Sequence, residues 1–152
     1  MLKNLYAHRK VLNGKEILIW AKKQGFDHTL PEKELHITCI YSSAKVDWSE
    51  IKADDSHIKI IGGKREIEVF GDDKNIVVLR VQSNVLQTRF DYFKKHGCSY
   101  DFPSYKPHVT ITYKKDPKMN IKDIIPYHGD ILLGEEIFAE INEDYSPNEK
   151  KT

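Results

Sequence analysis

Two segments of the chain carry the same arrangement of residues that could do acid–base chemistry. Residues 35–41 read Leu-His-Ile-Thr-Cys-Ile-Tyr, and residues 107–113 read Pro-His-Val-Thr-Ile-Thr-Tyr. Both are rich in β-branched residues, which favours strands. Successive side chains of a strand point to opposite faces, so a histidine and the threonine two residues later share a face. The two pairs are His36 with Thr38 and His108 with Thr110.

These residue types suit the cleavage of a phosphodiester. Imidazole titrates near neutral pH, so one histidine can begin as a general base while the other, protonated, begins as a general acid. The threonine hydroxyls can donate hydrogen bonds to the non-bridging phosphate oxygens. Together these groups supply proton transfer and charge stabilisation, so we predict no metal ion and no cofactor. The residue pattern alone leaves a second interpretation open, in which both histidines are structural.

The elements that must position these pairs follow from the apolar pattern. Strands are predicted over residues 2–11, 34–42, 57–61, 66–70, 75–81, 107–113 and 135–141. Helices are predicted over residues 14–24 and from a cap at Ser83 to Gly97, with a helical turn over residues 120–125. This order gives two similar halves with one histidine motif each. We therefore predict an α+β fold of two pseudo-symmetric lobes, with antiparallel sheets, helices packed outside and a central cleft.

Several local features lead to further expectations. Gly62-Gly63-Lys64 and Gly71-Asp72-Asp73-Lys74 are predicted to be hairpin turns. Tyr41 and Tyr113 stand at an odd offset from their histidines, so they are predicted to face away from them and join the core. His8 lies in a polar context and is predicted to be exposed. Neither half contains a glycine-rich dinucleotide loop or a P-loop.

The composition of the whole chain limits the class of partner. The 152 residues predict one domain over residues 1–141, followed by a polar tail over residues 142–152. The balance of 24 basic against 23 acidic residues disfavours a protein that coats long nucleic acids. Two cysteines imply neither a zinc site nor a disulfide framework. The sequence shows neither a signal peptide nor a membrane span, which predicts a cytoplasmic location. The oligomeric state is left open.

The paired His-x-Thr strands resemble the 2H phosphoesterase superfamily, which is named after two such histidines. The surrounding framework looks like one branch, the phage anti-CBASS nucleases, which degrade the cyclic oligonucleotide signals of a bacterial immune system. The resemblance covers the chain from the first strand to Glu140, and both His-x-Thr motifs match without departure. The framework consists of Trp20-Ala21-Lys22-Lys23-Gln24-Gly25, Thr29-Leu30-Pro31 and Val46-Asp47-Trp48.

This resemblance implies a 2H phosphoesterase-like fold and a metal-independent reaction. A ribose 2′-hydroxyl would attack the neighbouring 3′–5′ phosphodiester of a cyclic di- or trinucleotide, such as 3′,3′-cyclic GMP-AMP, with the two histidines as acid and base. The four motif residues would be catalytic. In this branch an N-terminal aromatic and a C-terminal acidic residue contact the bases, and the matching positions here are Tyr6 and Glu136. A viral chain of this kind would act in the cytoplasm of the infected host.

Two other functions remain open at the level of the sequence. The same fold could open 2′,3′-cyclic phosphates at RNA ends, or the chain could bind nucleotides as a sponge without cleaving them. Two intact His-x-Thr pairs disfavour the sponge, because binding alone needs no matched acid and base.

Overall fold

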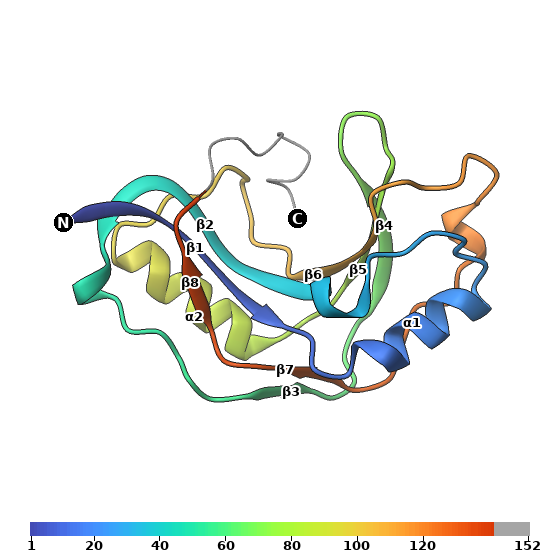
Figure 1. The fold of residues 1–152 in the computed structure, drawn as a ribbon, viewed down its shortest axis with the longest axis horizontal. Coiled ribbons are helices and arrows are strands. Elements are labelled where there is room, and N and C mark those ends of the chain that lie inside the picture. The colour runs from blue at the N-terminus through green and yellow to red at the C-terminus, as the bar shows by residue number, and fades with distance from the viewer. Residues whose placement is uncertain (142–152) are drawn as a thin grey trace.

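The computed structural model describes residues 1–141 of the chain (Figure 1). The strands are β1 (Leu2–Lys10), β2 (His36–Asp47), β3 (Ile58–Ile60), β4 (Glu66–Phe70), β5 (Ile76–Arg80), β6 (His108–Thr112), β7 (Ile131–Leu133) and β8 (Ile137–Ala139). The helices are α1 (Gly14–Lys23) and α2 (Asn84–Lys95), with 3-10 turns at Glu32–Glu34, Trp48–Glu50 and Ile121–Asp123. Every strand and helix predicted from the sequence is present. The strand β7 was not predicted.

Six strands form one antiparallel sheet in the order β4-β5-β6-β2-β1-β8. Its two halves, β4-β5-β6 and β2-β1-β8, meet between the two histidine strands, where Ile37 pairs with Val109. The two motifs therefore lie on neighbouring strands at the centre of the sheet. The antiparallel α+β architecture with two helices confirms the predicted fold class.

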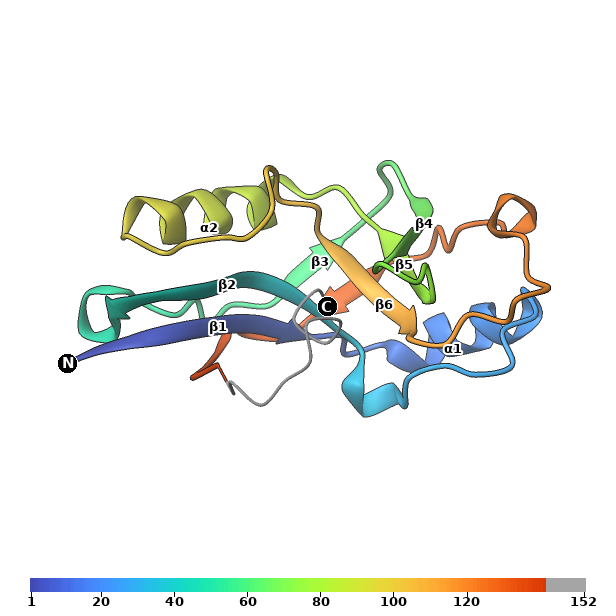
Figure 2. The ribbon, with the colours of Figure 1, turned by 90° about the horizontal axis from the view of Figure 1, so that it is seen from above.

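One face of the sheet is covered by the main core, and α2 packs there. Ile37 and Val109 are fully buried in this core together with the α2 residue Phe93. The helix begins as predicted, because the Ser83 side chain accepts a hydrogen bond from the backbone N–H of Leu86. Figure 2 shows α2 running alongside β2, with α1 at the opposite end of the molecule. The other face of the sheet carries the histidines.

A β-bulge in the β1–β2 pair changes which residues face the histidines. Ala7 pairs with Ile40 and His8 pairs with Thr38, so one extra residue stands in β2. A bulge of this kind shifts the alternation of the side chains by one position. Tyr41 consequently pairs with Tyr6, and their ring centroids are 5.6 Å apart. The prediction that Tyr41 faces away from the histidines was wrong, because the bulge restores it to their face.

The two glycine-rich connections differ in structure. Residues 71–74 form the predicted hairpin turn, since Phe70 pairs with Ile76 and the Lys74 N–H donates to the Gly71 carbonyl. Residues 62–64 do not form a hairpin, because β3 pairs with β7 in a separate two-stranded sheet. That prediction was wrong: the partner of β3 comes from much later in the chain, and a local pattern carries no information about it.

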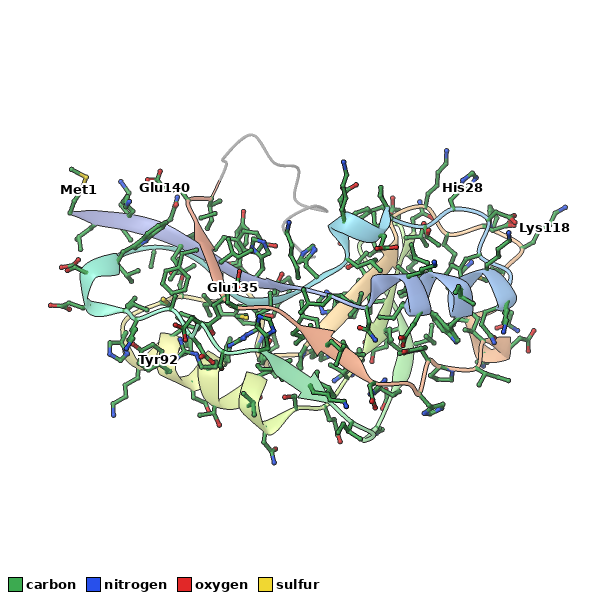
Figure 3. The ribbon with its side chains drawn as sticks, turned by 60° about the horizontal axis from the view of Figure 1, so that its bottom comes forward. Met1, His28, Tyr92, Lys118, Glu135 and Glu140 are labelled. Carbon is green, nitrogen blue, oxygen red and sulfur yellow. The ribbon has the colours of Figure 1, made fainter. Side chains whose placement is uncertain are left out.

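Figure 3 shows the side chains of the described residues, with Met1 and Glu140 at one end of the molecule and His28 and Lys118 at the other. Within residues 1–141, no helix has the length and apolar character needed to cross a membrane. The predicted tail, residues 142–152, lies outside the described residues, so the division of the chain at residue 141 stays a prediction.

Candidate active site

The four motif residues form a small grid on the face of the sheet opposite the main core. Ile37 and Val109 are directly opposite each other in an antiparallel pair and point into the core. Their neighbours along each strand therefore point to the other face. The antiparallel register sets His36 across from Thr110 and Thr38 across from His108, with cross-strand Cβ separations of roughly 5 Å. Each histidine thus stands beside the threonine of its own strand and the threonine of the other.

Both imidazoles are held in the same way. The Nδ1 atom of His36 lies 2.8 Å from the Glu34 carbonyl oxygen, and the Nδ1 atom of His108 lies 2.8 Å from the Lys106 carbonyl oxygen. A carbonyl oxygen can only accept, so each Nδ1 carries the proton and donates it. Both Nε2 atoms are buried and have no hydrogen-bond partner among the described residues. Each Nε2 is therefore the ring nitrogen available to take or give a proton.

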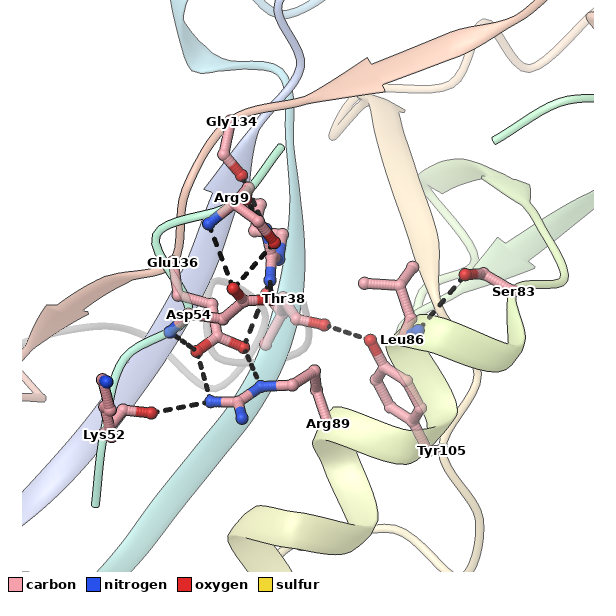
Figure 4. Close-up of polar contacts among 11 residues, drawn as sticks. Arg9, Thr38, Lys52, Asp54, Ser83, Leu86, Arg89, Tyr105, Gly134 and Glu136 are labelled. Atoms are coloured by element: carbon pink, nitrogen blue, oxygen red, sulfur yellow. Dashed lines mark hydrogen bonds and ion pairs between the residues drawn. The ribbon is translucent and has the colours of Figure 1, made fainter. Parts of the chain in front are cut away.

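The threonines differ in their surroundings. The Thr110 hydroxyl is buried and has no hydrogen-bond partner among the described residues. Buried hydroxyls are usually paired, so an unpaired one beside two free imidazole nitrogens points to a ligand. The Thr38 backbone carbonyl accepts a hydrogen bond of 2.8 Å from the buried Tyr105 hydroxyl (Figure 4). Tyr105 lies three residues before His108. This hydrogen bond therefore links the segment that leads into the second motif to the backbone of the first motif.

A basic residue stands across from each histidine on the outer side of the grid. Lys10 of β1 pairs with His36, and Arg80 of β5 pairs with His108. Arg80 donates to the Glu68 carboxylate at 2.7 Å, which holds its guanidinium in place. Positive charge on both flanks of a cleft attracts an anionic substrate such as a phosphodiester.

His108 is the more enclosed of the two histidines. Burial, with smaller contributions from the nearby His36 and Arg80, lowers the pKa of His108 to about 4, although the hydrogen bond to the Lys106 carbonyl and the Glu68 charge act to raise it. The Phe70 ring meets His108 edge-on, with centroids 5.0 Å apart. At neutral pH this imidazole is uncharged, which suits a general base.

A cleft of about 370 Å³ opens beside His108. Its walls come from the β4–β5 hairpin, through Phe70 and Asp72, and from the loop before β6, through Tyr100 and Phe102. This volume lies within the usual range of small-molecule sites.

Tyr6 lies on the same face as the histidines. Its ring is half-buried and meets His36 edge-on, with centroids 6.4 Å apart. His8, two residues along β1, is also half-buried and pairs with Thr38. The prediction that His8 is exposed was wrong, because β2 and Tyr6 cover one side of its ring. Sequence alternation along β1 from Tyr6 would have found it.

Glu136 lies apart from this face. Its carboxylate is fully buried, accepts two hydrogen bonds of 2.6 and 2.8 Å from Arg89 and one of 2.8 Å from the Asp54 backbone N–H. The Arg9 guanidinium, which is also fully buried, lies 3.6 Å from it (Figure 4). The structure therefore does not bring Glu136 to the histidines. Its oxygens are engaged by Arg89 and the Asp54 backbone, and a contact with a base stays a prediction from the resemblance.

Within residues 1–141, no group of three or more His, Cys, Asp or Glu side chains is arranged to hold a metal ion. Both cysteines, Cys39 and Cys98, are free and buried.

The fold is similar to that of phosphoesterases of known structure. A crystal structure described as a phosphoesterase matches with a TM-score of 0.64 and 11% identity, covering 97% of this chain and 92% of that one. Escherichia coli LigT complexed with 3′-AMP matches with a TM-score of 0.59 and 13% identity, covering 91% and 87%. At these identities the likeness concerns the fold.

Sequence comparison identifies the family to which the chain belongs, which the likeness in fold does not. The model of the family described as anti-CBASS protein Acb1 matches residues 3–148, so the chain belongs to the Acb1 family. An anti-CBASS protein Acb1 from Caulobacter sp. is 39% identical over 97% of this chain, and one from Sphingomonas paeninsulae is 38% identical over 94%. One from Acinetobacter phage Ac42 is 32% identical over 55%. The chain spans 24% of the length of each of the first two relatives and 54% of the phage relative.

Proposed function

We propose that the chain is a phosphodiesterase that cleaves the 3′–5′ bonds of cyclic di- and trinucleotide immune signals, such as 3′,3′-cyclic GMP-AMP, without a metal ion. In this way it would counter CBASS defence in the cytoplasm of an infected bacterium. One observation carries the proposal. In a chain of the Acb1 family, His36 and His108 share one face, each with Nδ1 bound to a carbonyl and Nε2 buried and free.

The proposed reaction begins at a ribose 2′-hydroxyl of the substrate. One imidazole Nε2 takes the hydroxyl proton while the 2′ oxygen forms a bond to the adjacent phosphorus. The bond from phosphorus to the 5′ oxygen breaks, and the second imidazole donates its proton to that oxygen. The product is a linear nucleotide that ends in a 2′,3′-cyclic phosphate. Water then opens this ring to a terminal phosphate with the two roles reversed.

The surroundings of the two histidines favour one assignment of the first step. His108 is neutral at pH 7, because burial holds its pKa at about 4. We assign to His108 the removal of the 2′ proton and to His36 the protonation of the 5′ oxygen. His36 is only half-buried and faces the more open β1 side, where a proton can be resupplied from solvent.

The remaining groups stabilise the charge that develops on the phosphate. The free Thr110 hydroxyl can donate to a non-bridging oxygen, and Thr38 stands at the equivalent place beside the other histidine. Such donors act strongly in a site from which water is excluded. Lys10 and Arg80 add positive charge on either side.

Product analysis with three substrates tests the proposal. The protein is incubated with 3′,3′-cyclic GMP-AMP, a cyclic trinucleotide and an RNA that ends in a 2′,3′-cyclic phosphate, each with excess EDTA. We expect the cyclic nucleotides to be cleaved, and His36→Ala and His108→Ala to lose cleavage. His96→Ala is the matched control, because His96 also binds a carbonyl through Nδ1 but is exposed on α2.

Other outcomes would replace the proposal. Opening of the RNA end alone would make the chain an RNA-end phosphodiesterase. Tight binding of cyclic nucleotides without any product would make it a sponge. Cleavage that stops in EDTA would contradict the metal-free reaction.

A further inference from the structure

The residues paired with the two motifs are similar across from the histidines and different across from the threonines. On the outer strands, Lys10 stands across from His36, as Arg80 stands across from His108. Two residues away along each strand, His8 of β1 pairs with Thr38, whereas Val78 of β5 pairs with Thr110. An imidazole on one side therefore takes the place of a fully buried aliphatic side chain on the other. The site is symmetric in its reacting groups and asymmetric in what surrounds them.

His8 contacts both Tyr6, the residue expected to hold a base, and His36, a residue expected to be catalytic. Its ring stacks on Tyr6 with centroids 4.8 Å apart and an angle of 19° between the planes. It meets His36 edge-on, with centroids 5.6 Å apart. A group that contacts His8 consequently lies near both the Tyr6 ring and the His36 imidazole.

One ring nitrogen of His8, the buried Nδ1, has no hydrogen bond within the described residues. Leaving such an atom unpaired destabilises the protein, and a hydrogen bond to a ligand would offset that cost. Burial, with smaller contributions from the nearby His36 and Lys10, lowers the pKa of His8 to about 4. A neutral imidazole offers one donor and one acceptor, which matches a hydroxyl group.

We propose that His8 is a third site histidine, which determines specificity by hydrogen bonding a ribose hydroxyl of the nucleoside unit on the β1 side. The proposal rests on the proposed function, because it concerns the same substrate. In a nucleotide the ribose adjoins both the base and the phosphate, as His8 adjoins both Tyr6 and His36. On the β5 side, Val78 offers only apolar contact. The enzyme therefore holds the two nucleoside units of a cyclic dinucleotide by different chemistry.

Two substitutions of His8 distinguish the contribution of its nitrogen atoms from the contribution of its ring. His8→Phe keeps a ring against Tyr6 and removes both nitrogens, while His8→Gln keeps a donor and an acceptor and removes the ring. We expect His8→Phe to raise KM for 3′,3′-cyclic GMP-AMP about tenfold or more, as for a lost hydrogen bond in a polar site, with kcat changed much less. His8→Gln should recover part of that loss. His28→Phe is the control, because His28 is exposed at the far end of the molecule (Figure 3).

A binding measurement gives a second readout that needs no turnover. In the His108→Ala background, we expect 3′,3′-cyclic GMP-AMP to bind more tightly than its doubly 2′-deoxy analogue. The ratio of the two dissociation constants should fall to near one when His8→Phe is added. An unchanged ratio, or a wild-type KM in His8→Phe, would overturn the role of His8 while leaving the proposed function intact. If the wild-type protein neither cleaves nor binds any cyclic nucleotide, the proposed function itself fails, and the ribose contact fails with it.

Discussion

His36 and His108 are held by the same local geometry, although they are 72 residues apart in the chain. Each is the first residue of its strand, and each donates from Nδ1 to the carbonyl two residues earlier over 2.8 Å. The strand then carries the threonine to the same face. The repeated motif thus encodes the orientation of the imidazole as well as its position, which leaves both Nε2 atoms free for proton transfer.

Thr110 and Thr112 provide a direct test of the role of the free hydroxyl. Thr110 Oγ1 has no hydrogen-bond partner among the described residues, whereas Thr112 Oγ1 accepts from the Lys114 N–H at 3.0 Å. We expect Thr110→Val to lower kcat by about 10²-fold, as for a donor to transition-state charge, without loss of stability. Thr112→Val should lower the free energy of unfolding by about 1 kcal/mol and leave kcat unchanged. Equal effects of both substitutions on kcat would contradict this account.

The burial of His108 predicts how stability depends on pH. The pKa of His108 is about 4 in the folded protein against 6.5 for the free side chain, so the unfolded chain binds the proton first as the pH falls. The free energy of unfolding should therefore be unaffected above pH 6.5 and decline between pH 6.5 and 4, by on the order of 3 kcal/mol from this group. Urea denaturation at several pH values measures this decline. His108→Gln should make it shallower, and a decline of the same size in that variant would refute the assignment.

Glu136 should act on stability rather than on substrate choice. Its buried carboxylate holds Arg89 and lies close to Arg9, so Glu136→Gln leaves buried positive charge poorly compensated. We expect the free energy of unfolding to fall by about 3 kcal/mol. The control Glu140→Gln breaks only an exposed contact to Lys3 and should change it by less than about 0.5 kcal/mol. A change in preference between cyclic nucleotides in folded Glu136→Gln would support the role that the sequence suggested.

Tyr6 should contribute to binding through its ring. It lies half-buried beside His36 on the site face, where a purine could stack on it. We expect Tyr6→Leu to raise KM roughly tenfold, because stacking on an aromatic ring contributes about 1–3 kcal/mol per base. Tyr6→Phe should keep most of the affinity. Steady-state kinetics measure both, and a larger loss in Tyr6→Phe than in Tyr6→Leu would be inconsistent with stacking.

The sequence predicted the parts of this structure that depend on local pattern. Alternation located the strands, Ser83 marked the start of α2, and the repeated His-x-Thr motif indicated both histidine strands. The features that it missed depend on pairing between distant segments. The bulge opposite Ala7 and His8 turned Tyr41 toward the site, and β3 found its partner in β7 rather than β4.

The sequence likewise indicated some residues of the candidate site and missed others. His36 and His108 were recognisable because each repeats a motif whose geometry is local. His8 was missed because a single histidine in a polar stretch shows nothing of the strand across from it. Glu136 was matched by the resemblance to a base-contacting position, since neither its burial nor its contact with Arg89 can be read from the neighbouring residues. Charges buried by tertiary contacts are not visible to a local pattern.

The position of isotopic oxygen in the first product tests the central claim most directly. Cleavage of 3′,3′-cyclic GMP-AMP is followed in water enriched in oxygen-18, with excess EDTA, and the first linear product is analysed by mass spectrometry. Attack by the 2′-hydroxyl predicts a 2′,3′-cyclic phosphate that carries no label, with oxygen-18 entering only when the ring opens. A first product that already carries oxygen-18 in a terminal phosphate, without a cyclic phosphate before it, would contradict the proposed mechanism.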